Sequence, residues 1–162
     1  MPGTLFIKPV EANLVRDTAT LRKMDPYCRF SIGNQMINSE VCKTGGTHPH
    51  WKQSLDMHLN IDQSKCLVEV IDEDLPKDDQ IGSCEIDLNE VRKEGQLKKW
   101  YPSQHGNKKA GEILLELSFQ NEAINPADEK IEEEIEEMRM EGEGGHSPAY
   151  WENRKYEKRT LL

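Results

Sequence analysis

The stretch Val70-Ile-Asp-Glu-Asp-Leu-Pro-Lys-Asp-Asp-Gln-Ile-Gly82 joins an apolar segment to a loop that is crowded with carboxylates. Because side chains alternate along a strand, Asp72 and Asp74 point the same way at the end of that segment. Asp78 and Asp79 follow a few residues later. Carboxylates held close together repel unless a cation lies between them, and hard oxygen ligands suit calcium better than zinc or copper. The stretch therefore predicts a strand that ends in a calcium-type cation site.

Short apolar or alternating runs continue on both sides of this stretch and are separated by turn residues such as Gly33-Asn34. Regularly spaced short runs are typical of an antiparallel sandwich. Residues 1–120 are therefore predicted to form an all-β domain, in which only 88–97 has room for a short helical turn. Its eight strands are expected at 4–12, 27–32, 35–42, 55–61, 66–71, 81–88, 99–102 and 112–119.

Residues 121–162 have a different composition and are predicted to form an acidic helical tail. Helix-start signals at Asn125-Pro126 favour a helix over about 126–141, a glycine-rich break follows at 142–145, and a second short helix is expected over about 148–160. The first of these helices would carry one narrow apolar stripe, formed by Ala127, Ile131, Ile135 and Met138. A helix with so narrow an apolar stripe cannot fold alone in water. The tail is either a solvated segment, a helix that orders on a protein partner, or a pair of segments that fold on each other. The partner-binding candidates are Ile131, Ile135, Met138, Tyr150 and Trp151.

The overall composition excludes several classes of protein. A formal net charge of -9 argues against a nucleic-acid binder, and no apolar run approaches the roughly 20 residues of a membrane-spanning helix. The N-terminal apolar stretch is too short for a signal peptide. The four cysteines, which lie far apart in the sequence, are interpreted as reduced and mostly buried thiols. A cytoplasmic location is expected.

Several motifs occur in the order in which the C2 domain family carries them, and together they resemble that family over about residues 3–119. The most characteristic is Met24-Asp-Pro-Tyr-Cys, which resembles the S/M-D-P-Y-V strand start of the family. The acidic stretch resembles the second calcium loop. The other matching segments are Gly3–Leu14 at the opening strand, Lys43-Thr44 with His48-Pro-His-Trp51, Trp100-Tyr101, and Gly111-Glu-Ile-Leu-Leu-Glu-Leu at the closing strand.

This resemblance implies an eight-stranded C2-type sandwich of the permuted topology, with calcium loops at one end. In the family, five aspartates from two loops bind two or three calcium ions. Asp25, Asp72, Asp74 and Asp79 stand at matching positions, although Asp78 is an alternative to Asp79. The fifth position holds Ala19, and Asp17 would have to reach over from two residues earlier. Calcium affinity falls with each carboxylate lost.

The acidic loops therefore have two interpretations, an incomplete calcium site or a remnant whose carboxylates are solvated or paired with lysines such as Lys77. The resemblance also implies membrane contact through apolar loop tips, which here are Leu21, Met24, Leu75 and Pro76. The lysine-rich strand that some members use for phosphoinositides has no counterpart, because 35–42 contains no lysine.

No catalytic motif stands in the sequence, so the chain is not expected to be an enzyme. The preferred hypothesis is a non-catalytic adaptor subunit of a larger assembly, held by its C-terminal tail, in a setting such as a cytoskeletal or ciliary complex. The alternative is a calcium-dependent phospholipid-binding module that targets a membrane through its loops. The first hypothesis makes calcium irrelevant, whereas the second requires Asp72 and Asp74.

Overall fold

The computed structural model describes residues 2–122, and these form eight β-strands and one short helix. The predicted helices of the tail and its five candidate contact residues lie outside the described residues. Residues 4–120 form one compact unit. In chain order the elements are β1 (Gly3–Leu14), β2 (Pro26–Ile32), β3 (Gln35–Asn38), β4 (Leu55–Leu59), β5 (Lys65–Asp72), β6 (Asp79–Asp87), α1 (Leu88–Glu94), β7 (Gln96–His105) and β8 (Lys108–Asn121).

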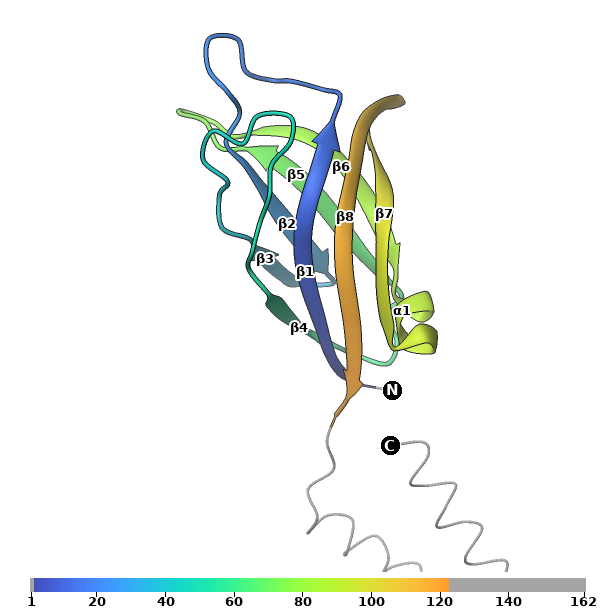
Figure 1. Cartoon of the computed structure of the whole chain (residues 1–162). Helices are drawn as coiled ribbons and strands as arrows, with labels where there is room; N and C mark the ends of the chain where they lie inside the picture. Colours follow the sequence, from blue (N-terminus) through green and yellow to red (C-terminus); the bar gives the residue numbers. More distant parts are fainter. Residues whose placement is uncertain (1, 123–162) are drawn as a thin grey trace, which may run out of the picture. The chain divides into compact units, whose positions relative to one another are not determined.

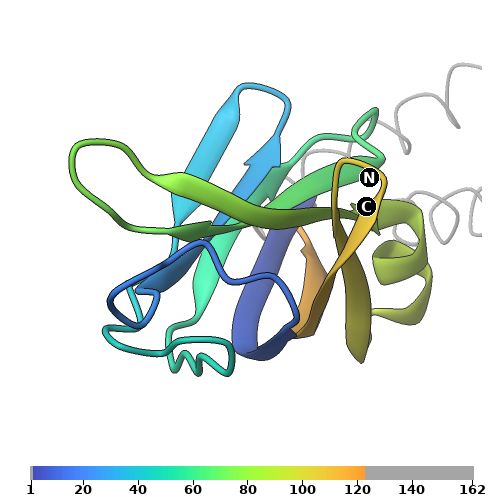
Figure 2. The ribbon, with the colours of Figure 1, turned by 90° about the horizontal axis from the view of Figure 1, so that it is seen from above.

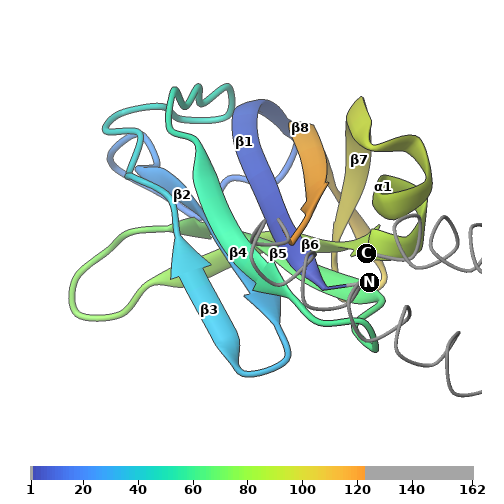
Figure 3. The ribbon, with the colours of Figure 1, turned by 90° about the horizontal axis from the view of Figure 1, so that it is seen from below.

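The strands follow the order β3-β2-β5-β6-β7-β8-β1-β4 and fold into a two-layered sandwich (Figure 1). The pair β6–β7 is joined in register at a single position, Ser83 opposite Gln104. The sheet therefore divides there into one layer of β3, β2, β5 and β6 and a second of β7, β8, β1 and β4. Views along the strands show the two layers facing each other, with α1 at the edge beside β7 (Figures 2 and 3). The predicted eight-stranded antiparallel sandwich is confirmed.

The core lies between the layers because inward-facing apolar residues alternate with outward-facing ones. In β1, for example, Leu5 and Ile7 are fully buried, whereas Lys8 is exposed. Trp51, in the His48-Pro-His-Trp51 segment, is also buried, and its indole N–H donates to the carbonyl oxygen of Pro26 at 3.2 Å. This bond ties the long β3–β4 connection to the start of β2. The four cysteines are free thiols, as expected.

Strands β3 and β4 and helix α1 end two or more residues earlier than the sequence pattern indicated, β4 at Leu59 rather than 61. Strand β3 ends at Asn38 rather than 42, because the hydroxyl of Ser39 accepts the N–H of Cys28 at 2.8 Å where a backbone carbonyl would otherwise do so. Helix α1 ends at Glu94 rather than 97, because Gly95 adopts a φ of 79° and donates its N–H to Val91. Side-chain and glycine chemistry thus interrupts patterns that apolar spacing alone would continue.

Gly111→Ala tests the close approach of β8 to β1. Gly111 has a φ of 137°, and a Cβ there would collide with the backbone carbonyl of Asn13 and lie 2.8 Å from the Cα of Leu14. Since backbone atoms cannot move aside cheaply, we expect a loss of more than about 3 kcal/mol in the free energy of unfolding. The matched control is Gly106→Ala, where φ is 62° and no atom lies within 4 Å. Urea unfolding should show a loss of only about 1–2 kcal/mol for the control, which is the cost of placing an alanine in the left-handed region, and equal losses would contradict this account.

Candidate functional site

Two loops meet at one end of the sandwich, opposite the end at which β1 begins and β8 finishes (Figure 1). Loop A, residues 15–25, connects β1 to β2, and loop B, residues 73–78, connects β5 to β6. Strand β2 pairs with β5 so that Pro26 lies opposite Asp72. The register therefore brings the end of loop A against the start of loop B, and the predicted acidic residues of the two loops gather there. We call this region the loop end.

Asp72 lies at the centre of the loop end and has no exposed surface. Its Oδ1 accepts the backbone N–H of Asp25 at 2.8 Å, and its Oδ2 accepts the hydroxyl of Thr18 at 3.0 Å. Arg22 donates to both oxygens, with Nη1 at 3.3 Å from Oδ1 and Nη2 at 3.0 Å from Oδ2. A buried carboxylate is tolerated only when it is paired and hydrogen-bonded. Asp72 meets that requirement with donors from loop A alone.

The guanidinium of Arg22 lies among three carboxylates. Besides Asp72, its Nη2 is 3.3 Å from Asp74 Oδ2 and its Nη1 is 3.6 Å from Asp25 Oδ2. The hydrogen bond to Asp72, the first of several causes, raises the pKa of Arg22 above its ordinary value. The same group donates to the backbone oxygens of Lys23 at 2.8 Å and Glu73 at 3.3 Å. Arg22 therefore connects loop A to loop B through side chains and backbone together.

The remaining acidic candidates lie in separate environments. Asp78 Oδ2 accepts the hydroxyl of Tyr27 at 2.7 Å and its Oδ1 accepts the N–H of Asp74 at 3.0 Å. These bonds, that of Tyr27 above all, hold the pKa of Asp78 below its usual range, while burial and then the neighbouring Asp78 raise the pKa of Tyr27 to about 12. Asp79 is exposed and is the cross-strand partner of Asp72. Asp17 accepts the N–H of Ala19 at 3.0 Å and so bonds within its own loop.

This arrangement does not fit a calcium ion. Calcium requires six to eight oxygens at about 2.3–2.6 Å, whereas the three carboxylates that converge here point at nitrogen atoms of Arg22. The position of the fifth carboxylate is held by Ala19, and Asp17 does not replace it. Within residues 2–122, no group of three or more histidine, cysteine or acidic side chains is arranged to hold a metal. Loops A and B are thus held together by a side-chain cation.

The predicted loop tips divide into exposed and buried residues. Leu21 in loop A is 99% exposed and Leu75 in loop B is 92% exposed, and Pro76 is exposed beside it. Met24 is fully buried in the core, so it contributes nothing to an exposed tip. Its burial follows from its place immediately before Asp25, where the chain turns into β2 and the side chain enters the sandwich. Each exposed leucine stands within two residues of an exposed lysine, Lys23 or Lys77.

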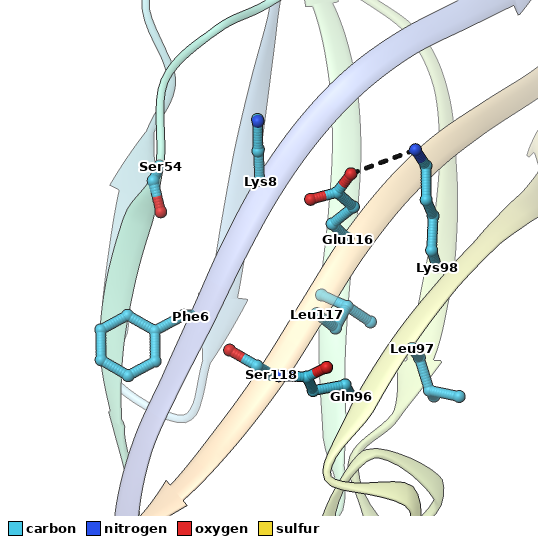
Figure 4. Close-up of a pocket in the computed structure, with 9 residues that line it drawn as sticks. All are labelled: Phe6, Lys8, Ser54, Gln96, Leu97, Lys98, Glu116, Leu117 and Ser118. Carbon is cyan, nitrogen blue, oxygen red and sulfur yellow. Dashed lines mark ion pairs between the residues drawn. The ribbon is translucent and has the colours of Figure 1, made fainter.

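A hollow of about 440 Å³ lies elsewhere, on the solvent face of β1, β7 and β8 (Figure 4). Phe6 and Lys8 line it from β1, and Lys98 pairs across it with Glu116 at 3.1 Å. Lys98 and Glu116 pair with each other, which leaves the positive charge of Lys8 among the lining residues, and no nucleophile with an adjacent base lines the hollow. The hollow therefore offers no chemistry to compare with that of the loop end.

Sequence reasoning identified the acidic residues of the loop end but missed Arg22 and Thr18, which complete it. Arg22 stands three residues before Asp25, in a loop that also contains Arg16 and Lys23. The basic residues of this loop could have predicted its role. Once the strand that begins at Met-Asp-Pro-Tyr is paired with β5, these residues lie opposite the acidic loop B. Lysine pairing was considered for Lys77, which makes no ion pair with the described residues, whereas the arginine of the other loop makes three.

The C2 domain family model matches residues 3–103, and the chain belongs to this family. Its eight-stranded sandwich and the position of its acidic loops define the same class of module. Part of extended synaptotagmin-1 of Rattus norvegicus is 30% identical over 115 residues, which cover 70% of this chain and 10% of that protein. The chain thus spans only a small share of the length of this relative.

Solved structures agree with the assignment. A C2 domain-containing protein superposes with a TM-score of 0.68 at 28% identity, covering 77% of this chain and 93% of that one. A calcium-bound pair of C2 domains from extended synaptotagmin 2 gives a TM-score of 0.64 at 31% identity, covering 79% of this chain and 49% of that one. In the described part of this chain, no helix is long and apolar enough to cross a membrane.

Asp72→Asn tests whether the buried carboxylate supports the loop end. The amide keeps the shape but replaces an acceptor oxygen with a donor, which then faces the N–H and O–H donors of Thr18, Arg22 and Asp25. We expect a loss of about 2–4 kcal/mol in the free energy of unfolding. The control Asp79→Asn alters an exposed carboxylate that has no side-chain bond among the described residues, so it should change stability by less than about 0.5 kcal/mol. Denaturant titrations of both variants measure these free energies of unfolding. An Asp72→Asn protein as stable as the wild type would contradict a supporting role for the buried carboxylate.

Proposed function

We propose that this chain is a non-catalytic C2 module that attaches to anionic phospholipid membranes through its loop end. The observation that carries the proposal is the pair of almost fully exposed leucines, Leu21 and Leu75, at the tips of two loops that Arg22 ties together. Most other large apolar residues of the sandwich lie in its core. Two apolar tips held at a fixed separation suit partial insertion into a membrane surface.

Two charges beside the tips, those of Lys23 and Lys77, complement an anionic surface. Lys23 and Lys77 are exposed and make no ion pair with residues 2–122, while Arg22 offsets part of the negative charge of the aspartates beneath. Full burial of a leucine contributes about 1.5–3 kcal/mol, and a lysine near an anionic surface about 1 kcal/mol. The four residues together supply roughly 5–8 kcal/mol, which corresponds to dissociation constants between millimolar and micromolar. Such binding is reversible and suits a module that works beside a second attachment.

Vesicle sedimentation tests the membrane contact. With chelator present, we expect the wild type to pellet with vesicles that contain phosphatidylserine and to remain in solution with neutral phosphatidylcholine vesicles. Leu21→Asp with Leu75→Asp should weaken pelleting by at least about tenfold, because apolar burial is lost and charge is placed against the headgroups. Ile61→Asp is the matched control, since Ile61 is 69% exposed but lies in the β4–β5 connection, away from the loop end. Equal pelleting of the loop variant and the control would contradict the proposal.

A second function is an adaptor subunit of a larger assembly, such as a cytoskeletal or ciliary complex. The observation that favours it is again Arg22, because an acidic loop end held by its own cation makes calcium dispensable, as the adaptor hypothesis requires. The contact residues of this proposal are Ile131, Ile135, Met138, Tyr150 and Trp151, which lie outside the described residues.

Ile135→Asp tests the adaptor function through affinity purification of the tagged chain. We expect loss of the associated proteins with the sandwich still folded, because a charge would interrupt the apolar stripe predicted for the tail. Glu134→Gln, a neighbouring change at a polar position of that pattern, is the control and should retain them. Identical sets of co-purified proteins from wild type and Ile135→Asp would argue against this function.

A further inference from the structure

Asp72 has no unused acceptor position. A carboxylate offers about four lone-pair positions, and Asp72 receives one backbone N–H, one hydroxyl and two N–H groups of Arg22. A calcium ion would need at least one of these positions at a much shorter distance than the nitrogen atoms occupy. Calcium could bind Asp72 only after Arg22 had been displaced.

Arg22 is fixed from both sides of the loop end. Its fork meets Asp72 with two nitrogens, and its remaining contacts include backbone oxygens in loop A and loop B. A guanidinium stays charged at every physiological pH and matches the two oxygens of a carboxylate. Displacement would therefore cost several charge-assisted hydrogen bonds and leave the guanidinium beside the incoming ion.

The neighbouring carboxylates are committed in the same way. Asp25 Oδ1 accepts the N–H of Thr44 at 2.7 Å and Asp74 Oδ1 accepts the N–H of Leu75 at 2.8 Å. The other oxygen of each faces Arg22, at 3.6 Å and 3.3 Å respectively. Every oxygen that converges on the centre of the loop end is thus directed at the one guanidinium.

We propose that Arg22 is the resident cation of this C2 domain, so that its acidic loops are closed without calcium and calcium competes with Arg22 for the same oxygens. Three of the residues that would serve as ligands, Asp25, Asp72 and Asp74, converge here, but the side chain of Arg22 lies between them. The loop end therefore keeps the same conformation, with Arg22 in place, over the calcium concentrations at which sensor modules bind calcium and change conformation. This inference concerns the cation alone and holds whether or not the tips meet a membrane.

Calorimetric titration of the full chain with calcium, without lipid, tests the inference. The variants are Arg22→Gln, which removes the charge and shortens the reach, and Lys23→Gln, which removes a neighbouring charge that makes no ion pair within residues 2–122. We expect wild type and Lys23→Gln to show no saturable binding below about 1 mM, the weak limit of calcium modules. Arg22→Gln should bind at least about tenfold more tightly than either.

Thermal unfolding gives a second readout. Without calcium, Arg22→Gln should melt below the wild type because Asp72 loses its counter-charge, and calcium should raise its melting temperature while leaving wild type and Lys23→Gln unchanged. If Arg22→Gln does not fold, Arg22→Lys replaces it in both experiments, since one ammonium cannot bridge Asp72 through two nitrogens. That variant should also bind calcium more tightly than the wild type.

Two results would overturn the inference. Saturable calcium binding by the wild type below about 1 mM, which is within the range of calcium modules, would show that calcium displaces Arg22 readily. Calcium affinities of Arg22→Gln and Lys23→Gln that agree within about twofold would show that only general charge matters, since a charge in either position acts at long range. Failure of vesicle binding would leave these results unaffected, because no lipid is present in either experiment.

Discussion

A carboxylate without solvent contact must find its donors inside the protein, and Asp72 finds them in a hydroxyl, a backbone N–H and the fork of Arg22. All three donors come from loop A, whereas Asp72 ends β5. The pairing of β2 with β5 brings them within reach. Removing Arg22 would leave a buried charge without its counter-charge, which costs far more than an exposed ion pair contributes. The conformation of both loops depends on this contact.

The surface of the loop end follows from the same contact. Arg22 also bonds the backbone of Glu73, so loop B is positioned by loop A as well as by its own strands. Leu21 immediately precedes Arg22, and Leu75 follows Asp74, another carboxylate that pairs with Arg22. The two exposed leucines are therefore placed by residues that form the ion cluster beneath them. The guanidinium of Arg22 and the exposed pair Leu21 and Leu75 are therefore parts of the same arrangement of loops A and B.

Local pattern was sufficient to predict most of the fold. Alternation and turn residues located all eight strands, because each inward-facing side chain, such as Leu5 or Phe30, must reach the one core between the layers. The acidic cluster was also predictable, since spacing of two along a strand places side chains on one face. Two of the elements that ended early did so at Ser39 and Gly95, where a single residue outweighs the periodic pattern.

The cation of the loop end was not predictable from local pattern. Arg22 and Asp72 are 50 positions apart, and only the tertiary pairing of β2 with β5 brings them together. The same limit applies to Met24. It is an apolar residue in a loop, as a membrane-contacting tip would be, but its side chain is buried in the core. Family resemblance supplied the expectation of calcium from four matching aspartates. The resemblance assigned no role to the position of Arg22. It therefore could not show that the guanidinium of Arg22 pairs with three of the four aspartates.

A crystal structure of the protein grown in millimolar calcium tests the central claim most directly. The account predicts that the guanidinium of Arg22 remains between Asp72 and Asp74, with no ion bound to either carboxylate. Density for a metal at about 2.3–2.6 Å from oxygens of Asp72, with Arg22 turned toward solvent, would contradict it.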